Sequence, residues 1–222
     1  MKIKAVLLDL DGTLLNTLDD IADSANYALS ALGYPPHPVS AYRYFVGQGV
    51  DNLVKNAVPE SERTPEKLAS VKKIYMERYA KHSMDKTRPY DGVVATLEEL
   101  KKIPVKLAVV SNKPERDTKS TVILTFAPEL FDAVTGGREG VPLKPDPAAV
   151  YNILGEFGVS PQETMFIGDT MVDIATAKNA GCVSVGVMWG FRPEELSAAG
   201  EVGADFVIDC PSELIDLVRL HK

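Results

Sequence analysis

Short runs of apolar residues recur along the chain, each bounded by charged or turn-forming residues. The first run, from Ile3 to Leu8, is apolar apart from Lys4, which is typical of a strand buried on both faces of a parallel sheet. Similar runs predict further strands at Val105–Val110, Thr164–Ile167, Val183–Val187 and Phe206–Ile208. A weaker signal predicts one more strand at Asp132–Thr135.

Segments with apolar residues three or four positions apart lie between these runs and predict helices. They are Val93–Lys102, Glu115–Phe126, Pro147–Phe157, Val172–Ala180 and Ser212–Leu220. Strands and helices therefore alternate, which is typical of a doubly wound α/β fold with a mainly parallel sheet. Ligands of such folds bind at the carboxyl edge of the sheet.

One stretch, residues 17–83, breaks this alternation because it has several helix signals and no convincing strand. Thr17 can cap a helix with two aspartates in its first turn, and Gly33 is a typical stop signal. Thr64-Pro65 predicts the start of another helix, since proline is favoured at the first helical position. We therefore predict an all-helical domain over residues 17–83, inserted into an α/β core formed by residues 1–16 and 84–222.

The composition is that of a soluble globular protein: 222 residues, 45% hydrophobic, with a formal net charge of −7. This acidic balance argues against nucleic-acid or anionic-membrane binding, because both require a basic face. No apolar run approaches the roughly 18 residues of a membrane span, and the first run is too short for a signal peptide, so we expect a cytoplasmic protein. Cys182 and Cys210 have apolar neighbours and are interpreted as buried packing residues.

Acidic residues follow two of the predicted strands. One strand runs into Asp9-Leu10-Asp11-Gly12-Thr13 and another into Gly168-Asp169-Thr170-Met171-Val172-Asp173. Alone, the first pattern is also typical of a turn and the second of a helix N-terminus. Together they place carboxylates at one sheet edge, where a divalent cation would relieve their repulsion, and oxygen ligands favour Mg²⁺. Asp169 would join this metal site, and Asp173 could orient a metal-bound water or a nearby lysine.

Two further segments could bind a phosphoryl group at the same edge. The strand over residues 105–110 ends in Ser111-Asn112-Lys113, which supplies a hydroxyl and backbone N–H groups. Lys144 lies in Leu143-Lys144-Pro145-Asp146-Pro147, where two prolines stiffen the backbone around a point charge. A lone lysine in a loop is usually solvated, but the acids predicted nearby make Lys144 a site candidate.

The four segments occur in an order and at spacings that resemble the haloacid dehalogenase (HAD) superfamily of phosphotransferases, over nearly the whole chain. The helical insertion after the first motif resembles the subgroup with an all-helical cap, and within it the phosphoglycolate phosphatase-like members. The resemblance implies a Rossmann-like core in which Mg²⁺ is held by Asp9, the Asp11 carbonyl and Asp169. It also implies that Asp9 is the nucleophile, which forms an aspartyl-phosphate, and that Asp11 protonates the leaving oxygen and then activates water.

The same resemblance implies roles for further residues. The phosphoryl group would be bound by Thr13, Ser111, Asn112 and Lys144. The cap loop near the substrate would contain Arg43, Gly47, Gln48 and Gly49. Asn16 departs from the family pattern, because many relatives carry Asp at this position. The pattern does not fix the residue at position 48, which is Gln48 here. These two positions leave the identity of the substrate open.

The expected function is that of an Mg²⁺-dependent phosphomonoesterase acting on a small phosphorylated metabolite, with 2-phosphoglycolate as the leading substrate. Two alternative functions within the same family remain open: a β-phosphoglucomutase-like phosphotransferase and a pyrophosphatase. A dehalogenase proper attacks carbon and needs no acid at position 11, so Asp11 argues against it. A phospho-aspartate signalling module that does not turn over would have about 120 residues and no helical insertion.

Three residues near the predicted site have no assigned role. Trp189 is interpreted mainly as a core residue, while Arg138 and Arg192 could face solvent or reach a substrate. We expect a monomer or a homodimer.

The excess negative charge lies entirely in the predicted core, because residues 17–83 hold eight basic and eight acidic side chains. Within the predicted site, one lysine faces four aspartates, which leaves −3 if all are ionised: Lys144 against Asp9, Asp11, Asp169 and Asp173. Such a site should bind a phosphorylated anion only together with Mg²⁺.

Overall fold

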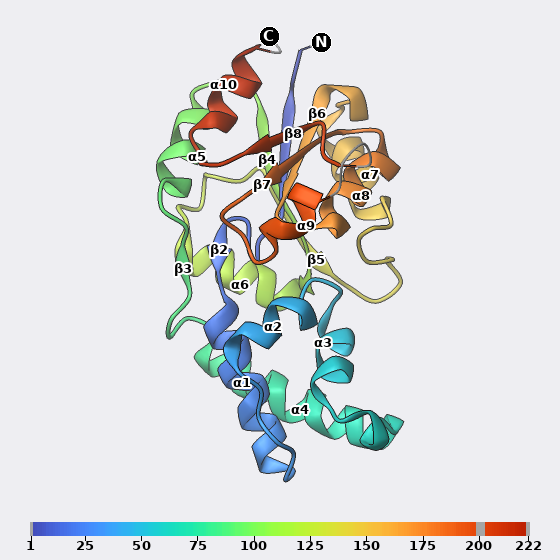
Figure 1. The fold of residues 1–222 in the computed structure, drawn as a ribbon. Helices are drawn as coiled ribbons and strands as arrows, with labels where there is room; N and C mark the ends of the chain where they lie inside the picture. Colours follow the sequence, from blue (N-terminus) through green and yellow to red (C-terminus); the bar gives the residue numbers. More distant parts are fainter. Residues whose placement is uncertain (1, 199–202, 221–222) are drawn as a thin grey trace.

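The computed structural model describes residues 2–198 and 203–220. Its centre is a parallel sheet of six strands in the order β5-β4-β1-β6-β7-β8 (Figure 1). The strands are β1 (Ala5–Leu8), β4 (Lys106–Pro114), β5 (Ala133–Gly137), β6 (Thr164–Gly168), β7 (Val183–Val187) and β8 (Phe206–Ile208). The predicted doubly wound α/β fold is thereby confirmed.

Helices cover both faces of the sheet, and this explains why the strand sequences are mainly apolar, and that of β1 entirely so. In β1, Val6 and Leu8 point into one hydrophobic cluster while Ala5 and Leu7 point into another. The first cluster contains side chains of α5 (Val93–Lys101), α6 (Glu115–Thr125) and α10 (Glu213–Leu220). The second contains side chains of α7 (Ala148–Phe157) and α8 (Met171–Ala180).

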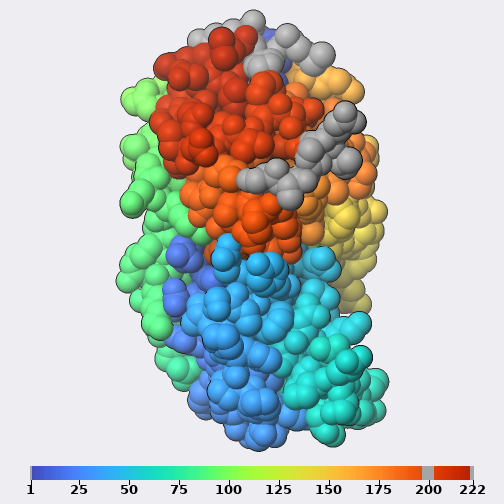
Figure 2. All heavy atoms as spheres, in the orientation of Figure 1, coloured from blue at the N-terminus to red at the C-terminus, as the bar shows by residue number. Residues whose placement is uncertain are grey.

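The segment after β1 forms a separate helical unit, whose hydrophobic cluster also includes Phe191 from the loop after β7. Its helices are α1 (Leu18–Ala31), α2 (Val39–Phe45), α3 (Val50–Ala57) and α4 (Pro65–His82), with a short 3₁₀ turn η1 (Glu60–Glu62). The Thr64 hydroxyl accepts a hydrogen bond from Lys67 N at the start of α4, as predicted. Figure 2 shows this unit as a blue and cyan lobe packed against the core. We refer to it below as the cap.

The predicted cap of α1 is wrong in one detail. The Thr17 hydroxyl makes no capping hydrogen bond and is buried without a partner among the described residues, whereas Asn16 Oδ1 accepts from Leu18 N at 3.4 Å. Gly33, with φ of 77°, follows the helix end as expected.

Two crossings connect the core and the cap, and they lie side by side. β2 (Leu15–Asn16) leads into the cap and pairs in antiparallel fashion with β3 (Arg88–Pro89), which leads back (Figure 1). The two remaining elements are η2 (Pro161–Glu163) and α9 (Pro193–Ala198).

The prediction for the cysteines is half right. Cys182 is buried, and burial raises the pKa of its thiol to about 12. Cys210 is exposed, because it follows the edge strand β8 in the turn before α10, where its thiol lies 3.3 Å from Glu213 Oε1. Over residues 2–198 and 203–220, no helix has the length and apolar character needed to cross a membrane.

Candidate active site

Three aspartates meet at the carboxyl edge of the sheet, where β1 and β6 lie next to each other. Each of Asp9, Asp169 and Asp173 offers one carboxylate oxygen, and these oxygens lie within 4.8 Å of one another. The local backbone is shaped around them: a Cβ on Gly12 would lie 2.3 Å from Asp169 Oδ2, and one on Gly190 would lie 2.1 Å from Asp169 Cβ. Only glycine fits at these two positions, so the sequence provides the space that Asp169 occupies.

Lys144 provides a positive charge within this group of acids. Its side chain is 3% exposed, and Nζ lies 2.7 Å from both Asp9 Oδ1 and Asp173 Oδ1. The other oxygen of Asp173 accepts hydrogen bonds from Thr170 N and Oγ1 at the start of α8. Asp173 therefore contacts the lysine, which agrees with one of the two roles predicted for it.

The electrostatics of the buried acids follow from this arrangement. Burial raises the pKa of Asp9 to about 7; the charges of Asp173 and Asp11 add to the effect and Lys144 opposes it. Burial also raises the pKa of Asp169, helped by Asp173 and Asp9. For Lys144, burial lowers the pKa, but the two carboxylates outweigh it and raise the pKa above its usual value.

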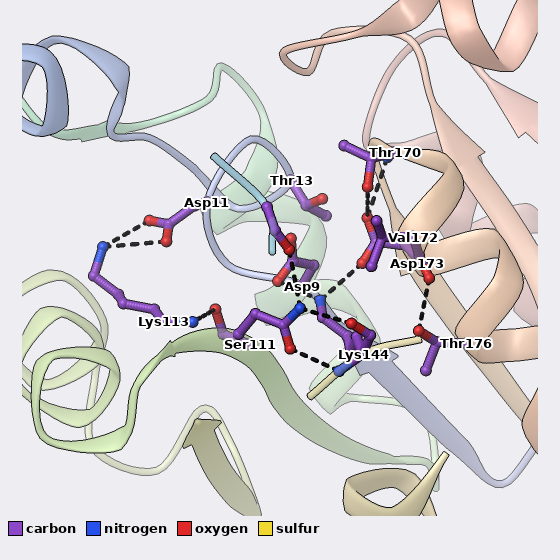
Figure 3. A network of polar contacts seen from close by, with 12 residues as sticks. Asp9, Asp11, Thr13, Ser111, Lys113, Lys144, Thr170, Val172, Asp173 and Thr176 are labelled. Carbon is purple, nitrogen blue, oxygen red and sulfur yellow. Dashed lines mark hydrogen bonds and ion pairs between the residues drawn. The ribbon is translucent and has the colours of Figure 1, made fainter. Parts of the chain in front are cut away.

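The Asp11 carboxylate is turned away from Asp9, toward Lys113 (Figure 3). Lys113 Nζ lies 2.8 and 3.2 Å from the two oxygens of Asp11 and donates to the Tyr79 hydroxyl of the cap at 2.7 Å. Lys113 is buried, with 5% of its side chain exposed.

Ser111 and Asn112 lie at the end of β4 and face the same pocket. Asn112 joins three segments: its Oδ1 accepts from Lys144 N at 2.8 Å, and its Nδ2 donates to Lys144 O at 3.0 Å and to Gly47 O at 2.9 Å. This one side chain therefore connects the β4 end, the Lys144 loop and the cap loop.

A pocket lies between the core and the cap. Core residues with ionisable or polar side chains line one side of it, among them Asp9, Ser111 and Lys144. The cap lines the other side, largely with apolar side chains: Ile21, Val46, Val50, Leu53 and Tyr75.

The donor set suits a divalent cation. Asp9 and Asp169 offer hard oxygen ligands, are buried, and have only Lys144 as a neutralising partner nearby among the described residues. When both are ionised the two carboxylates repel each other, and the charge of Asp9 contributes to the raised pKa of Asp169. The cluster could therefore hold a metal ion, which would remove this repulsion.

Comparison with known proteins agrees with this geometry. The model of the haloacid dehalogenase-like hydrolases matches residues 6–187. The chain belongs to this family. A phosphoglycolate phosphatase from Mannheimia succiniciproducens is 35% identical over 197 residues, which cover 86% of this chain and 88% of the relative. Another, from Vibrio vulnificus, is 33% identical over 222 residues, which cover 98% of this chain and 96% of the relative.

Solved structures of the family share the whole fold. The crystal structure of a predicted phosphoglycolate phosphatase from Haemophilus somnus superposes with a TM-score of 0.89 at 30% identity, covering 98% of each chain. The phosphatase-like relatives thus match both the α/β core and the helical cap of this HAD-like hydrolase.

Most residues predicted for the HAD site are brought together, but some lie differently from expectation. Thr13 is buried and its hydroxyl donates to Asp169 Oδ1 at 3.2 Å, so it contacts the acid cluster. In the cap loop, Gly47 and Gly49 line the pocket, whereas Gln48 is exposed and does not line the pocket as the described residues define it. Arg43 Nε donates to Phe191 O, so its side chain joins the cap to the loop after β7.

The structure also shows the surroundings of the three residues that had no assigned role. Trp189 packs against the core cluster and its Nε1 donates to Thr13 O at 2.9 Å, which confirms the core interpretation. Arg138 is largely exposed and pairs with Glu115. Arg192 is buried, contrary to a solvent-facing position, and its Nη1 lies 3.1 Å from Glu195 Oε1.

One buried charge was missed by sequence reasoning. Lys113 directly follows Ser111-Asn112, yet nothing in the local pattern separates it from an ordinary solvated lysine. Its burial depends on Tyr79, which comes from α4 in the cap. The alternation of side chains along an extended strand places Lys113 on the same side as Ser111, but it does not show that the cap buries the lysine.

Proposed function

We propose that this chain is an Mg²⁺-dependent phosphomonoesterase that works through a phosphoryl group bound to Asp9. The observation that carries the proposal is the position of the Asp9 carboxylate, which lies in the pocket, next to Lys144 and within the acid cluster. The phosphoglycolate phosphatases among its relatives support the reaction class.

The reaction would run in two balanced steps. In the first, an Asp9 oxygen attacks phosphorus, the ester P–O bond breaks, and Asp11 gives a proton to the leaving oxygen. In the second, Asp11 takes a proton from water, the water oxygen attacks phosphorus, and the Asp9–phosphorus bond breaks to release inorganic phosphate. For either step Asp11 must turn from Lys113 toward Asp9, because its carboxylate is now held by that lysine.

The remaining residues would stabilise charge on the transferring group. Lys144 Nζ and the Ser111 hydroxyl face the pocket beside Asp9, where they can bind phosphoryl oxygens. Asp9, Asp169 and the Asp11 carbonyl would hold Mg²⁺. When bound, this ion would supply charge neutralisation for the acids and the phosphoryl group.

The leading substrate is 2-phosphoglycolate. Its small size suits a pocket that the cap closes with apolar side chains, and the curated relatives bear the name of that activity. We also propose that the protein acts as a monomer or a homodimer on this small metabolite, which size-exclusion chromatography with light scattering would test.

Phosphate release from a panel of phosphoesters, with Mg²⁺ and with a chelator, tests the proposal. We expect release from 2-phosphoglycolate only with Mg²⁺. Asp9→Asn should abolish turnover and the acid-stable phosphoenzyme. Asp11→Asn should slow turnover by about 10²–10⁴-fold with the fold intact, although the melting temperature should fall because the buried Lys113 ammonium loses its carboxylate partner. Near-wild-type turnover of Asp9→Asn would refute the mechanism. Accumulation of a long-lived phosphoenzyme without release would indicate a signalling module instead, and dependence on a bisphosphate activator would indicate a mutase.

A further inference from the structure

The pocket contains a second buried ammonium group that the proposed reaction does not use. Lys113 Nζ is bound by the two oxygens of Asp11 and by the Tyr79 hydroxyl, and it lies 4.7 Å from the centre of the Tyr79 ring. In the part of the chain that the structure describes, Asp11 is its one carboxylate partner.

The two lysines of the pocket serve different acids. Lys144 is paired with Asp9 and Asp173, whereas Lys113 is paired with Asp11 (Figure 3). Figure 3 shows the two pairs on different sides of the site, with Lys113 on the side to which the Asp11 carboxylate is turned.

Turning Asp11 toward that oxygen would cost Lys113 its anionic partner. The ammonium would then keep the Tyr79 hydroxyl and the longer-range attraction of Asp117, but no carboxylate in direct contact among the described residues. A buried charge without a contacting partner is unfavourable. An anion on the leaving part of the substrate would restore the pair at the position that Asp11 has left.

We propose that Lys113 binds an anionic group on the leaving part of the substrate, in exchange for Asp11, and so selects phosphoesters whose leaving group is itself an acid. This inference rests on the proposed function. A carboxylate, as in the phosphoester of a small hydroxy acid, and a second phosphate, as in pyrophosphate, share the required chemistry.

The exchange also gives the substrate a part in activating the enzyme. Without an anion at Lys113, Asp11 stays bound to the lysine and is not available as a proton donor. A substrate with an anionic leaving group would compete with Asp11 for Lys113 and so release Asp11 to act as the proton donor.

The test compares the kcat/KM values of different substrates within each variant. A disturbance of Asp11 that affects all substrates equally then cancels from their ratio. The substrates are 2-phosphoglycolate, pyrophosphate and 2-hydroxyethyl phosphate, which is close in size to the first but has a neutral leaving group. The variants are Lys113→Met, Lys113→Arg and, as a control for loss of one exposed lysine, Lys119→Met in α6, which pairs with Glu115 on the surface.

For Lys113→Met we expect kcat/KM to fall by about 10–100-fold more for the preferred anionic substrate than for 2-hydroxyethyl phosphate, mainly through KM. Lys113→Arg should recover part of that preference, and Lys119→Met should behave like the wild type. Preference for 2-phosphoglycolate over pyrophosphate identifies the anion as a carboxylate, and the reverse preference identifies it as a phosphate.

An equal loss on all three substrates in Lys113→Met, with an unchanged melting temperature, would overturn the inference and leave Lys113 as a positioning residue for Asp11. Absence of phosphate release by the wild-type protein from any of the three would instead count against the proposed function. If Lys113→Met melts too low for assay, Tyr79→Phe provides a second variant: removing its hydroxyl should change the substrate preference in the same direction, and an unchanged preference would count against the inference.

Discussion

The buried acid cluster predicts that Mg²⁺ affinity depends steeply on pH. In the metal-free protein, burial raises the pKa of Asp9 from 3.8 to about 7. Between these two values the folded state holds a proton that the unfolded state has lost, so the contribution of Asp9 to the free energy of unfolding falls as the pH rises through this window. Binding of a cation needs the ionised carboxylate and therefore competes with that proton.

The size of the effect follows from this pKa. For one carboxylate that titrates at about 7, the apparent dissociation constant of Mg²⁺ should be about tenfold weaker at pH 6 than at pH 8. Asp169, whose pKa burial also raises, would make the dependence steeper. A tenfold change corresponds to about 1.4 kcal/mol. At saturating Mg²⁺, the gain in melting temperature should thus be roughly 3–6 °C larger at the higher pH.

Thermal melts with Mg²⁺ and with a chelator, at both pH values and constant ionic strength, measure this difference directly. Titration calorimetry provides the dissociation constants. Asp9→Asn should weaken binding and make its pH dependence shallower, leaving the part that comes from Asp169, whereas Asp216→Asn, which removes an exposed acid in α10, should change neither. An equal Mg²⁺ affinity of the wild-type protein at pH 6 and pH 8 would refute the assignment of the cluster as the metal site.

Two further substitutions test how the site is built. Gly190→Ala would place a Cβ 2.1 Å from Asp169 Cβ, so we expect calorimetry to show at least about tenfold weaker Mg²⁺ binding. The control Gly155→Ala should leave Mg²⁺ binding unchanged, because a Cβ at that position meets nothing within 4 Å. Asn112→Ala removes three hydrogen bonds to Lys144 and Gly47, and leaving buried backbone groups unpaired should cost about 2 kcal/mol, seen as a melting temperature lower by roughly 4–8 °C. Its KM should also rise, because the cap loop loses a contact with the core; unchanged melting and KM would show that the Asn112 contacts contribute little.

The central sheet could be predicted from sequence because burial on both faces removes polar residues from its strands. Four residues of β1 alternate between two clusters, and all are apolar. The β2–β3 ribbon could not be predicted, since Leu15–Asn16 and Arg88–Pro89 are too short to show a period. The helices α2 and α3 were expected only as part of a bundle, because neither carries a strong start signal such as Thr64-Pro65.

The acids of the site could be predicted because the topology alone assembles them. Asp9 and Asp169 follow neighbouring parallel strands, so their meeting requires no knowledge of loops or of the cap. Lys113 and Arg192 could not be placed in this way. Their burial depends on contacts across the boundary between core and cap or on loop packing after β7, and such contacts leave no periodic signal in the sequence.

The burial of Lys113 also changes the charge of the site. Counted from sequence, one lysine faced four aspartates; in the structure two buried lysines do, which leaves −2 when all six groups are ionised: Lys113 and Lys144 against Asp9, Asp11, Asp169 and Asp173. One divalent cation balances this charge. If Asp11, carrying the proton that it is to donate, gives up Lys113 to an anion of the substrate, the charge of that anion replaces the charge of Asp11. The lysine then stays paired, and only the charge of the phosphoryl group remains to be stabilised. Lys144 and Ser111 line the pocket beside Asp9, so the proposed requirement for Mg²⁺ and the proposed selection of an acidic leaving group would belong to one electrostatic arrangement.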